Sequence, residues 1–277
     1  KTTTSSILAW MLKSAGVDPS YMIGGIPRNL GQGATFTDSD FVVLEGDEYD
    51  TAFFDKRSKF LHYLPEVVVI NNIEFDHADI YNSLDEIKLT FKRLLNIVPR
   101  NGMAFVNGDC ANTMDVASDG PAPITTVGLG AECDLQITDV DYGRENTSFV
   151  LDGEHYVLPM AGEFNVRNAA MAICTARFSG FSADQIRHGL ASFEGIARRQ
   201  EVRGIAGGVR VIDDFAHHPT AIGLAVDSLR QQYPDSRLWV IFEPRSNTTR
   251  RNVFQGELAN ALSKADLVVV PAVPDPE

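Results

Sequence analysis

The chain has 277 residues, of which 44% are hydrophobic and 22% are charged, and its formal net charge at pH 7 is −13. This composition is ordinary for a globular protein, and the length predicts two domains rather than one. The acidic balance argues against a nucleic-acid-binding protein, which would need a clustered basic face, and no apolar run is long enough to span a membrane, so we expect neither partner.

The first part of the sequence alternates helical patterns with short apolar runs. Apolar residues at helical spacing predict helices at 5–16 and 84–95. Apolar runs at 41–44, 67–70 and 103–106 predict strands that are buried on both faces. Alternating strands and helices are typical of an α/β domain with a mostly parallel sheet.

Residues 134–158 differ, because apolar and polar residues alternate there between glycine turns. This pattern predicts a small antiparallel insertion or flap, followed by helices at 165–177 and 183–193. The best domain boundary lies at 196–199. A second α/β unit follows this boundary and looks incomplete. Its predicted strands are 202–205, 209–212, 238–242 and 267–270, and its predicted helices are 220–233 and 252–264.

The three cysteines, Cys110, Cys133 and Cys174, are widely spaced and show no disulfide or metal-binding pattern. We therefore expect free thiols in a reducing compartment. The sequence opens directly on a helical pattern and stops just after a predicted strand, so both ends look cut from a longer protein. The lack of a leader segment is then uninformative.

Lys1, Thr2 and Thr3 stand immediately before the first predicted helix, as in the last third of a phosphate-binding loop. In such a loop the lysine neutralises the β- and γ-phosphates of a nucleotide, and the first hydroxyl group binds magnesium. The glycines whose N–H groups cradle the phosphates come earlier in such a loop and are not in this sequence. The alternative is a chance Lys-Thr pair in front of a helix.

Acidic and polar side chains follow two of the predicted strands. Glu45 comes directly after the first strand, and Asn72 and His77 follow the second. Ligands of open α/β sheets bind beyond the carboxyl ends of the strands, and magnesium prefers carboxylate and hydroxyl oxygens. We therefore expect Glu45 to hold the nucleotide's metal opposite Thr2, and His77 to bind a metal or orient a substrate. The alternative is an acidic loop exposed to solvent.

Six segments, taken in order and spacing, resemble the Mur ligase family over essentially the whole chain. They are Lys1-Thr2-Thr3-Thr4, Glu45-Gly46-Asp47-Glu48, Asn72-Ile73-Glu74-Phe75-Asp76-His77, Gly162-Glu163-Phe164-Asn165-Val166-Arg167-Asn168, Arg198-Arg199-Gln200-Glu201 and Asp213-Asp214-Phe215-Ala216-His217-His218-Pro219-Thr220. The resemblance implies a central ATP-binding domain at 1–196, with a mostly parallel sheet and a small antiparallel subsheet. It also implies part of a Rossmann-like C-terminal domain at 197–277, while the family's UDP-binding N-terminal domain is absent from this sequence.

The resemblance also implies a role for each matching residue. Lys1, Glu45 and His77 would be catalytic, and Thr2, Glu45 and His77 would bind the metal. The nucleotide would contact Lys1, Thr2, Thr3, Asn168, Arg199 and Asp214. The substrates would contact Asn72, His217, His218, Arg245 and Ser246.

Two positions depart from the family's pattern. Phe164 stands where the family's Gly-x-His-Asn-x-x-Asn element usually carries its histidine. Lys88 lies one residue out of register with the lysine that several relatives carbamylate to bridge two metals, so it is not assigned that role.

The resemblance implies a bacterial, cytoplasmic amide ligase that uses ATP and Mg²⁺, or Mn²⁺, and forms an acyl phosphate. Segments 47–60 and 243–248 are similar to the branch that joins UDP-N-acetylmuramate to the murein tripeptide L-alanyl-γ-D-glutamyl-meso-diaminopimelate during cell-wall peptide recycling. One alternative is the branch that adds L-alanine to UDP-N-acetylmuramate. More distant alternatives are a folylpolyglutamate-synthase-like ligase and a nucleotide-binding module without ligase activity.

Overall fold

The computed structural model describes residues 1–76, 80–117, 120–244, 249 and 254–272. Its main sheet has six strands in the order β11-β10-β9-β8-β7-β6. The strands β6 to β9 run parallel to their neighbours, and β9, β10 and β11 are antiparallel. In chain order they are β6 (Val67–Ile70), β7 (Met103–Asn107), β8 (Ile124–Gly128), β9 (Leu135–Tyr142), β10 (Thr147–Leu151) and β11 (Glu154–Leu158). The predicted α/β class with a mostly parallel sheet and an antiparallel part is confirmed.

The predicted small antiparallel insertion at 134–158 is present as β9, β10 and β11, and these strands are continuous with the main sheet. Strand β9 pairs in parallel with β8 along one edge and antiparallel with β10 along the other. One long strand therefore joins both parts into a single hydrogen-bonded sheet. The sequence pattern missed this, because alternation in a strand reports which side chains are buried but not which strand lies beside it.

The strand predicted at 41–44 is present as β3 (Val42–Leu44), but Val42 is 57% exposed, so this strand is not buried on both faces as predicted. Most other short elements of the N-terminal half were not predicted. A three-stranded sheet has the order β2-β1-β3, and a hairpin of β4 and β5 leads into a 3₁₀ helix. Their bounds are β1 (Ser20–Met22), β2 (Ala34–Thr35), β3 (Val42–Leu44), β4 (Asp50–Ala52), β5 (Asp55–Ser58) and η1 (Lys59–His62). The missed strands β1, β2, β4 and β5 contain no apolar run like those at 67–70 and 103–106, so no pattern in the sequence marks them.

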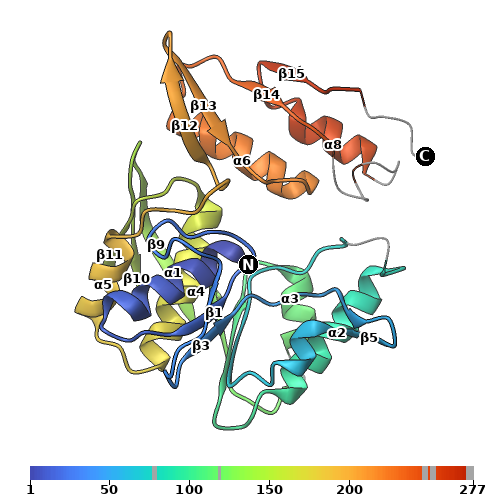
Figure 1. The fold of residues 1–277 in the computed structure, drawn as a ribbon, viewed down its shortest axis with the longest axis vertical. Helices are drawn as coiled ribbons and strands as arrows, with labels where there is room; N and C mark the ends of the chain where they lie inside the picture. Colours follow the sequence, from blue (N-terminus) through green and yellow to red (C-terminus); the bar gives the residue numbers. More distant parts are fainter. Residues whose placement is uncertain (77–79, 118–119, 245–248, 250–253, 273–277) are drawn as a thin grey trace.

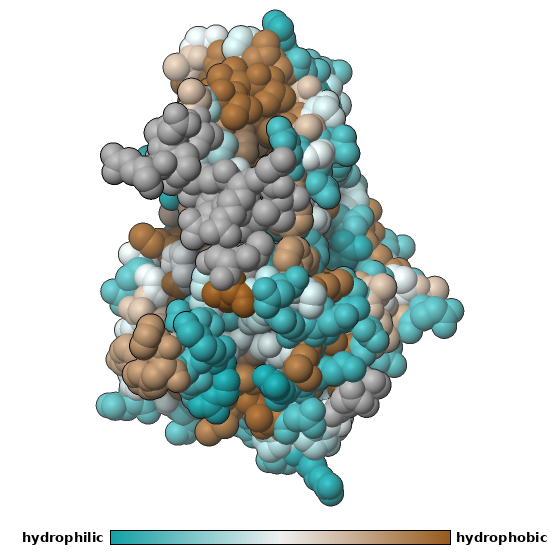
Figure 2. Space-filling view, turned by 90° about the vertical axis from the view of Figure 1, so that its right-hand side faces the viewer, coloured by the Kyte–Doolittle hydropathy of each residue, from teal (hydrophilic) through white to brown (hydrophobic). Residues whose placement is uncertain are grey.

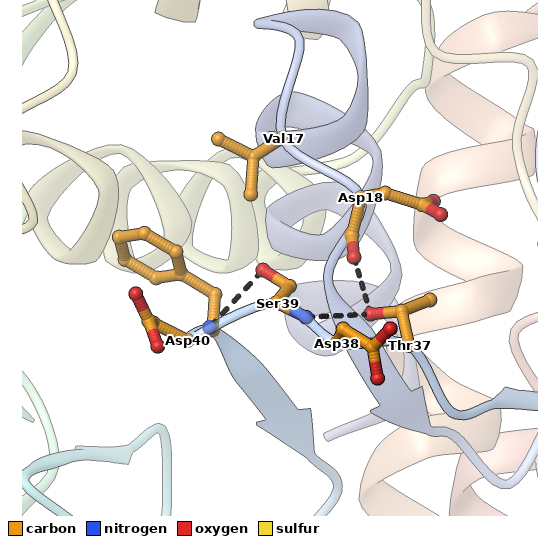
Figure 3. A pocket seen from close by; sticks show the side chains of 7 residues that line it. Val17, Asp18, Thr37, Asp38, Ser39 and Asp40 are labelled. Carbon is orange, nitrogen blue, oxygen red and sulfur yellow. Dashed lines mark hydrogen bonds between the residues drawn. The ribbon is translucent and has the colours of Figure 1, made fainter.

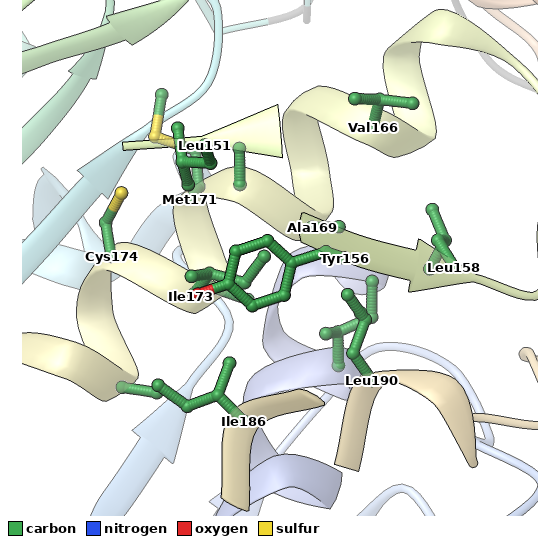
Figure 4. Packing of buried hydrophobic residues seen from close by; sticks show 14 of the residues in the cluster. Leu151, Tyr156, Leu158, Val166, Ala169, Met171, Ile173, Cys174, Ile186 and Leu190 are labelled. Atoms are coloured by element: carbon green, nitrogen blue, oxygen red, sulfur yellow. The ribbon is translucent and has the colours of Figure 1, made fainter. Parts of the chain in front are cut away.

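Helix α4 (Glu163–Phe178) is the centre of the main core. It packs against α1 (Thr2–Ser14), α5 (Ala183–Ala191) and the main sheet. Side chains from β11, α4 and α5 meet around Tyr156, which is fully buried (Figure 4). Because each fully buried large apolar side chain stabilises a fold by roughly 1.5–3 kcal/mol, this packing fixes the position of α1.

A second core lies on the other side of the main sheet, under α2 (Leu84–Ile97) and α3 (Ala111–Val116). Figure 1 shows both helices beside the strands β6 and β7 and away from α4. The predicted helix at 84–95 is therefore confirmed and extends by two residues. Among the described residues, no helix has both the length and the apolar character that a membrane crossing requires.

The described residues of the C-terminal segment, 197–244, 249 and 254–272, form a separate group of elements above the main sheet in Figure 1. A hairpin of β12 (Glu201–Ala206) and β13 (Val209–Asp213) precedes α6 (Pro219–Gln232). The parallel strands β14 (Trp239–Ile241) and β15 (Leu267–Val269) flank α8 (Gln255–Leu262), and α6 packs on α8. Figure 2 shows hydrophobic surface gathered over this upper part, where Trp239, Ile241 and Val270 are at least half exposed.

The close packing of α5 on α1 generates a prediction about stability. A Cβ atom at Gly189 would lie 2.6 Å from Ser14 Oγ and 2.9 Å from Met11 Cα. We expect Gly189→Ala to lower the free energy of unfolding by about 1–3 kcal/mol, because the overlap outweighs the better helix propensity of alanine. Urea denaturation measures this change. Gly204→Ala is the control, since a Cβ atom there has no neighbour within 4 Å, and equal stability of the two variants would contradict the prediction.

Candidate functional site

The predicted phosphate-loop residues lie at the start of α1, beside the carboxyl end of β3. Thr2 Oγ1 donates a hydrogen bond of 2.9 Å to Glu45 Oε1, and the backbone N–H of Gly24 donates one of 2.7 Å to Glu45 Oε2. A Cβ atom at Gly24 would lie 3.3 Å from both carboxylate oxygens, so glycine permits this close approach. The structure thus brings Thr2 and Glu45 together, although they are 43 residues apart in the sequence.

Lys1 is the N-cap residue of α1, and its Nζ forms an ion pair with the carboxylate of Glu48. The side chain of Lys1 is 47% exposed and that of Glu48 is 17% exposed, so the ammonium group stays accessible to a ligand. The sequence does not distinguish Glu48 from its neighbours, because it is one of several acids between 45 and 50. Only the fold places it against Lys1.

A second polar network joins α1, the end of β6 and α4. Thr4 Oγ1 accepts a hydrogen bond of 2.8 Å from Asn71 Nδ2 and donates one of 3.1 Å to Asn168 Oδ1. Asn168 was a predicted nucleotide contact, but Thr4 and Asn71 were not predicted. The predicted residue, Asn72, donates instead to Glu74 Oε1 at 3.1 Å. Successive residues of an extended segment point to opposite faces, so the two asparagines contact different partners.

The C-terminal segment contributes a guanidinium group to the start of α1. Arg199 donates a hydrogen bond of 3.2 Å to Thr2 Oγ1, and its guanidinium carbon lies 5.5 Å from the centre of the Phe215 ring. Close by, Asp214 accepts hydrogen bonds from the backbone N–H groups of Gln200, at 2.9 Å, and Ala216, at 2.7 Å. Burial raises the pKa of the Asp214 carboxyl group above its usual range, and these hydrogen bonds oppose that shift.

The two predicted histidines of the C-terminal segment lie at the start of α6. His218 is the N-cap residue, with Nδ1 3.3 Å from Glu74 Oε2 and Nε2 3.3 Å from the carbonyl oxygen of Phe75. His217 Nδ1 lies 3.0 Å from the carbonyl oxygen of Phe215. His218 therefore connects the C-terminal segment to the loop that follows β6.

Asp109 fixes a third strand end, that of β7. Its carboxylate accepts hydrogen bonds of 2.8 Å from the backbone N–H groups of Leu129 and Gly130, and one of 3.1 Å from Arg167 Nε. Partial burial acts to raise the pKa of Asp109, but these donors outweigh burial and lower it. Arg167 directly precedes Asn168 on α4, so Asp109 anchors the helix turn that carries a predicted nucleotide contact.

Three predicted site residues, His77, Arg245 and Ser246, lie outside the described residues. Lys88, which was not assigned a metal-bridging role, has its Nζ 3.0 Å from Asp115 Oδ2. Within the described ranges, no group of three or more His, Cys, Asp or Glu side chains could hold a metal. The hydroxyl group of Thr2 and the carboxylate of Glu45 nevertheless fit magnesium, because this ion binds through one or two carboxylates and completes its shell with water and phosphate oxygens.

Two cavities have linings that do not suit a triphosphate. One cavity of about 230 Å³ lies at the junction with the C-terminal segment. The negative charges of its acidic residues offset the positive charges of its basic residues. The charged residues of its lining are Arg28, Glu145, Glu194, Arg199 and Glu201. The other, of about 570 Å³, opens between α1 and β3 and is lined by Val17, Asp18, Thr37, Asp38, Ser39, Asp40 and Phe41 (Figure 3). Its three carboxylates would repel phosphate groups. The start of α1 is therefore the better site for an anion.

Sequence comparison places the chain among characterised families. The profile of the Mur ligase middle domain matches residues 1–176, and that of the Mur ligase glutamate ligase domain matches residues 198–276. A UDP-N-acetylmuramate–L-alanyl-γ-D-glutamyl-meso-2,6-diaminoheptandioate ligase of Escherichia coli is 39% identical over 97% of this chain and 59% of its own length. A UDP-N-acetylmuramate–L-alanine ligase of a Geobacter species is 34% identical over 98% of this chain and 58% of its own length. The chain thus spans about three fifths of these relatives.

Solved structures agree with this placement. A murein peptide ligase from Psychrobacter arcticus superposes with a TM-score of 0.73 and is 33% identical, covering 98% of this chain and 61% of that one. A UDP-N-acetylmuramate–alanine ligase from Thermotoga maritima gives a TM-score of 0.80 at 24% identity, covering 99% of this chain and 60% of that one, and supports the fold alone.

The network around Thr4 generates a prediction. Thr4→Val keeps the shape of a buried side chain but leaves Asn71 and Asn168 without its hydroxyl group. We expect the free energy of unfolding to fall by about 1–3 kcal/mol, measured by urea denaturation. Thr3→Val is the matched control, because Thr3 is equally buried and its hydroxyl group has no hydrogen-bond partner within the described part of the chain. If both variants lose the same stability, the network does not stabilise the site.

Proposed function

The chain belongs to the Mur ligase family, and from this premise we propose that its parent protein joins UDP-N-acetylmuramate to L-alanyl-γ-D-glutamyl-meso-diaminopimelate in an ATP-dependent reaction. The observation that carries this proposal is the contact of Thr2 with Glu45 and Arg199 at the start of α1, next to the ion pair of Lys1 with Glu48. The choice of amine rests on relatives of that name, which are 36% and 39% identical over 97% of the chain. The alanine-adding ligase remains the second candidate, since relatives of that name are up to 34% identical.

The proposed first step joins two anions, because a carboxylate of UDP-N-acetylmuramate attacks the γ-phosphate of ATP. The site must therefore concentrate positive charge where negative charge develops. Lys1 supplies an ammonium group, and Arg199 supplies a guanidinium group that already reaches Thr2. The product is an acyl phosphate and ADP. The amine nitrogen of the peptide then attacks the acyl carbon, phosphate leaves, and the amine's proton goes to solvent.

Thr2 and Glu45 would hold Mg²⁺, or Mn²⁺, whose charge would offset that of the phosphate oxygens. His77 is proposed as a further metal or substrate contact. The Thr2 hydroxyl group is hydrogen-bonded to Glu45, so the two oxygen ligands lie side by side. This preorganisation reduces the cost of ordering them when the nucleotide binds.

The remaining contacts are proposed from the same resemblance. Thr3, Asn168 and Asp214 would contact the nucleotide, which would lie between the two parts of the chain. Asn72, His217, His218, Arg245 and Ser246 would contact the substrates, with Arg245 presenting a two-pronged donor to a peptide carboxylate. We also propose a central domain at 1–196, the start of a C-terminal domain at 197–277, and a location in the bacterial cytoplasm.

The deciding experiment measures phosphate release by the full-length protein with ATP, Mg²⁺ and UDP-N-acetylmuramate. Release that depends on the tripeptide supports the proposed reaction. Release that depends only on free L-alanine supports the alanine-adding ligase and rejects the proposed amine. Release with neither amine, despite measurable ATP binding, supports a nucleotide-binding module without ligase activity.

A substitution of Lys1 tests the phosphate site directly. We expect Lys1→Met in the full-length protein to lower kcat by at least about a thousandfold, because phosphate transfer would lose a charge aimed at the γ-phosphate. Lys13→Met is the matched control at the other end of α1, where the lysine pairs with Asp18 on the surface. Retained ligation in Lys1→Met would reject the assignment of Lys1.

A further inference from the structure

The turn that follows β3 carries both Glu45 and Glu48, and hydrogen bonds from two directions fix it. Glu45 bonds to Gly24 and Thr2, while Glu48 pairs with Lys1. Residue 48 is three positions beyond residue 45, so the position of the Glu48 carboxylate depends on what holds the turn after β3.

Tyr81 holds the turn from the loop that follows β6. Its hydroxyl group donates a hydrogen bond of 2.8 Å to the backbone carbonyl oxygen of Glu48 and lies 2.7 Å from Ser58 Oγ. Ser58 is buried, with 2% exposure. Tyr81 therefore ties together the loops after β3 and β6, the two loops that carry the predicted metal ligands Glu45 and His77.

Lys59 holds the same turn from the end of the β4–β5 hairpin. Its Nζ donates a hydrogen bond of 2.7 Å to Asp47 Oδ2, and its backbone N–H donates one of 3.0 Å to the carbonyl oxygen of Tyr49. The backbone N–H of Phe60 donates to the carbonyl oxygen of Asp47 at 3.3 Å. Residues on both sides of Glu48 are thus attached to η1.

We propose that Glu48 is a positioning residue for Lys1, and that Tyr81 and Lys59 hold Glu48 in place for this purpose. An ammonium group has three N–H donors, so Lys1 can keep its bond to Glu48 while it donates to phosphate oxygens. Without Glu48, the flexible side chain of Lys1 would lose rotamer freedom only when the nucleotide binds. The ion pair with the Glu48 carboxylate restricts the Lys1 side chain before the nucleotide binds, and it directs the ammonium group toward the γ-phosphate.

This inference rests on the proposed function, since it assigns a role within the same phosphate site. Protein kinases offer a physical parallel, because there a phosphate-binding lysine must be paired with a glutamate for activity. The parallel concerns the chemistry of a lysine held by a carboxylate and implies no common fold.

The test compares two lysines of neighbouring segments in the full-length protein. Lys59 and Lys56 each bind an aspartate at 2.7 Å, but Lys56 binds Asp50 on the outer part of the hairpin. We expect Lys59→Met and Tyr81→Phe each to lower kcat by roughly tenfold, with little change in the KM for the amine. Lys56→Met should keep the kcat of the unmodified protein. Equal kcat for Lys59→Met and Lys56→Met would overturn the role of Lys59.

A double-mutant cycle separates positioning from a general effect on folding. We expect Glu48→Gln to lower kcat by tenfold or more, and Tyr81→Phe to have little further effect once Glu48 is glutamine. Fully multiplicative effects would show that Tyr81 does not act through Glu48 and would overturn the inference. Ligation must first be measured in the unmodified protein, because a lack of ligation there would reject the proposed function. A normal kcat in Glu48→Gln would reject this inference alone.

Discussion

The arrangement of the site depends on the two hydrogen bonds of the Thr2 hydroxyl group. This group donates to Glu45 from the turn after β3 and accepts from Arg199 in the C-terminal segment. One oxygen atom thus joins three regions that are far apart in the sequence. It can do so because α1 is fixed by the buried helix α4, so its first turn serves as a rigid reference for both partners.

The local charge of this site opposes the charge of the whole chain. The protein carries a formal net charge of −13, yet both Lys1 and Arg199 lie at the start of α1. Lys1 forms an ion pair with Glu48, and the guanidinium carbon of Arg199 lies 5.5 Å from the centre of the Phe215 ring. The carboxylate of Glu48 offsets the charge of Lys1, which lowers the repulsion between Lys1 and other cations of the site.

Some elements and site residues could be predicted from the sequence, and others could not. The apolar run at 67–70 coincides with β6, and the helix predicted at 84–95 coincides with most of α2, because both have strong patterns. The strands β1 and β2 and the β4–β5 hairpin were missed, since they contain no comparable apolar run. In the site, Lys1, Thr2, Glu45, Asn168, Arg199 and Asp214 were predicted, whereas Thr4, Glu48, Lys59, Asn71 and Tyr81 were not. Thr4, Glu48 and Lys59 lie in segments that match the family, but the resemblance gave them no role, and Asn71 and Tyr81 lie in no such segment.

The sequence by itself determined the α/β class, the position of most long elements, the family and the residues that match its motifs, because these depend on local periodicity and residue identity. The tertiary structure decided which of two adjacent asparagines reaches Thr4, which acid pairs with Lys1, and that β9 merges the parallel and antiparallel strands. Those choices depend on how segments separated by tens of residues pack together. Packing distances of a few ångströms between such segments leave no trace in the spacing of the residues along the chain.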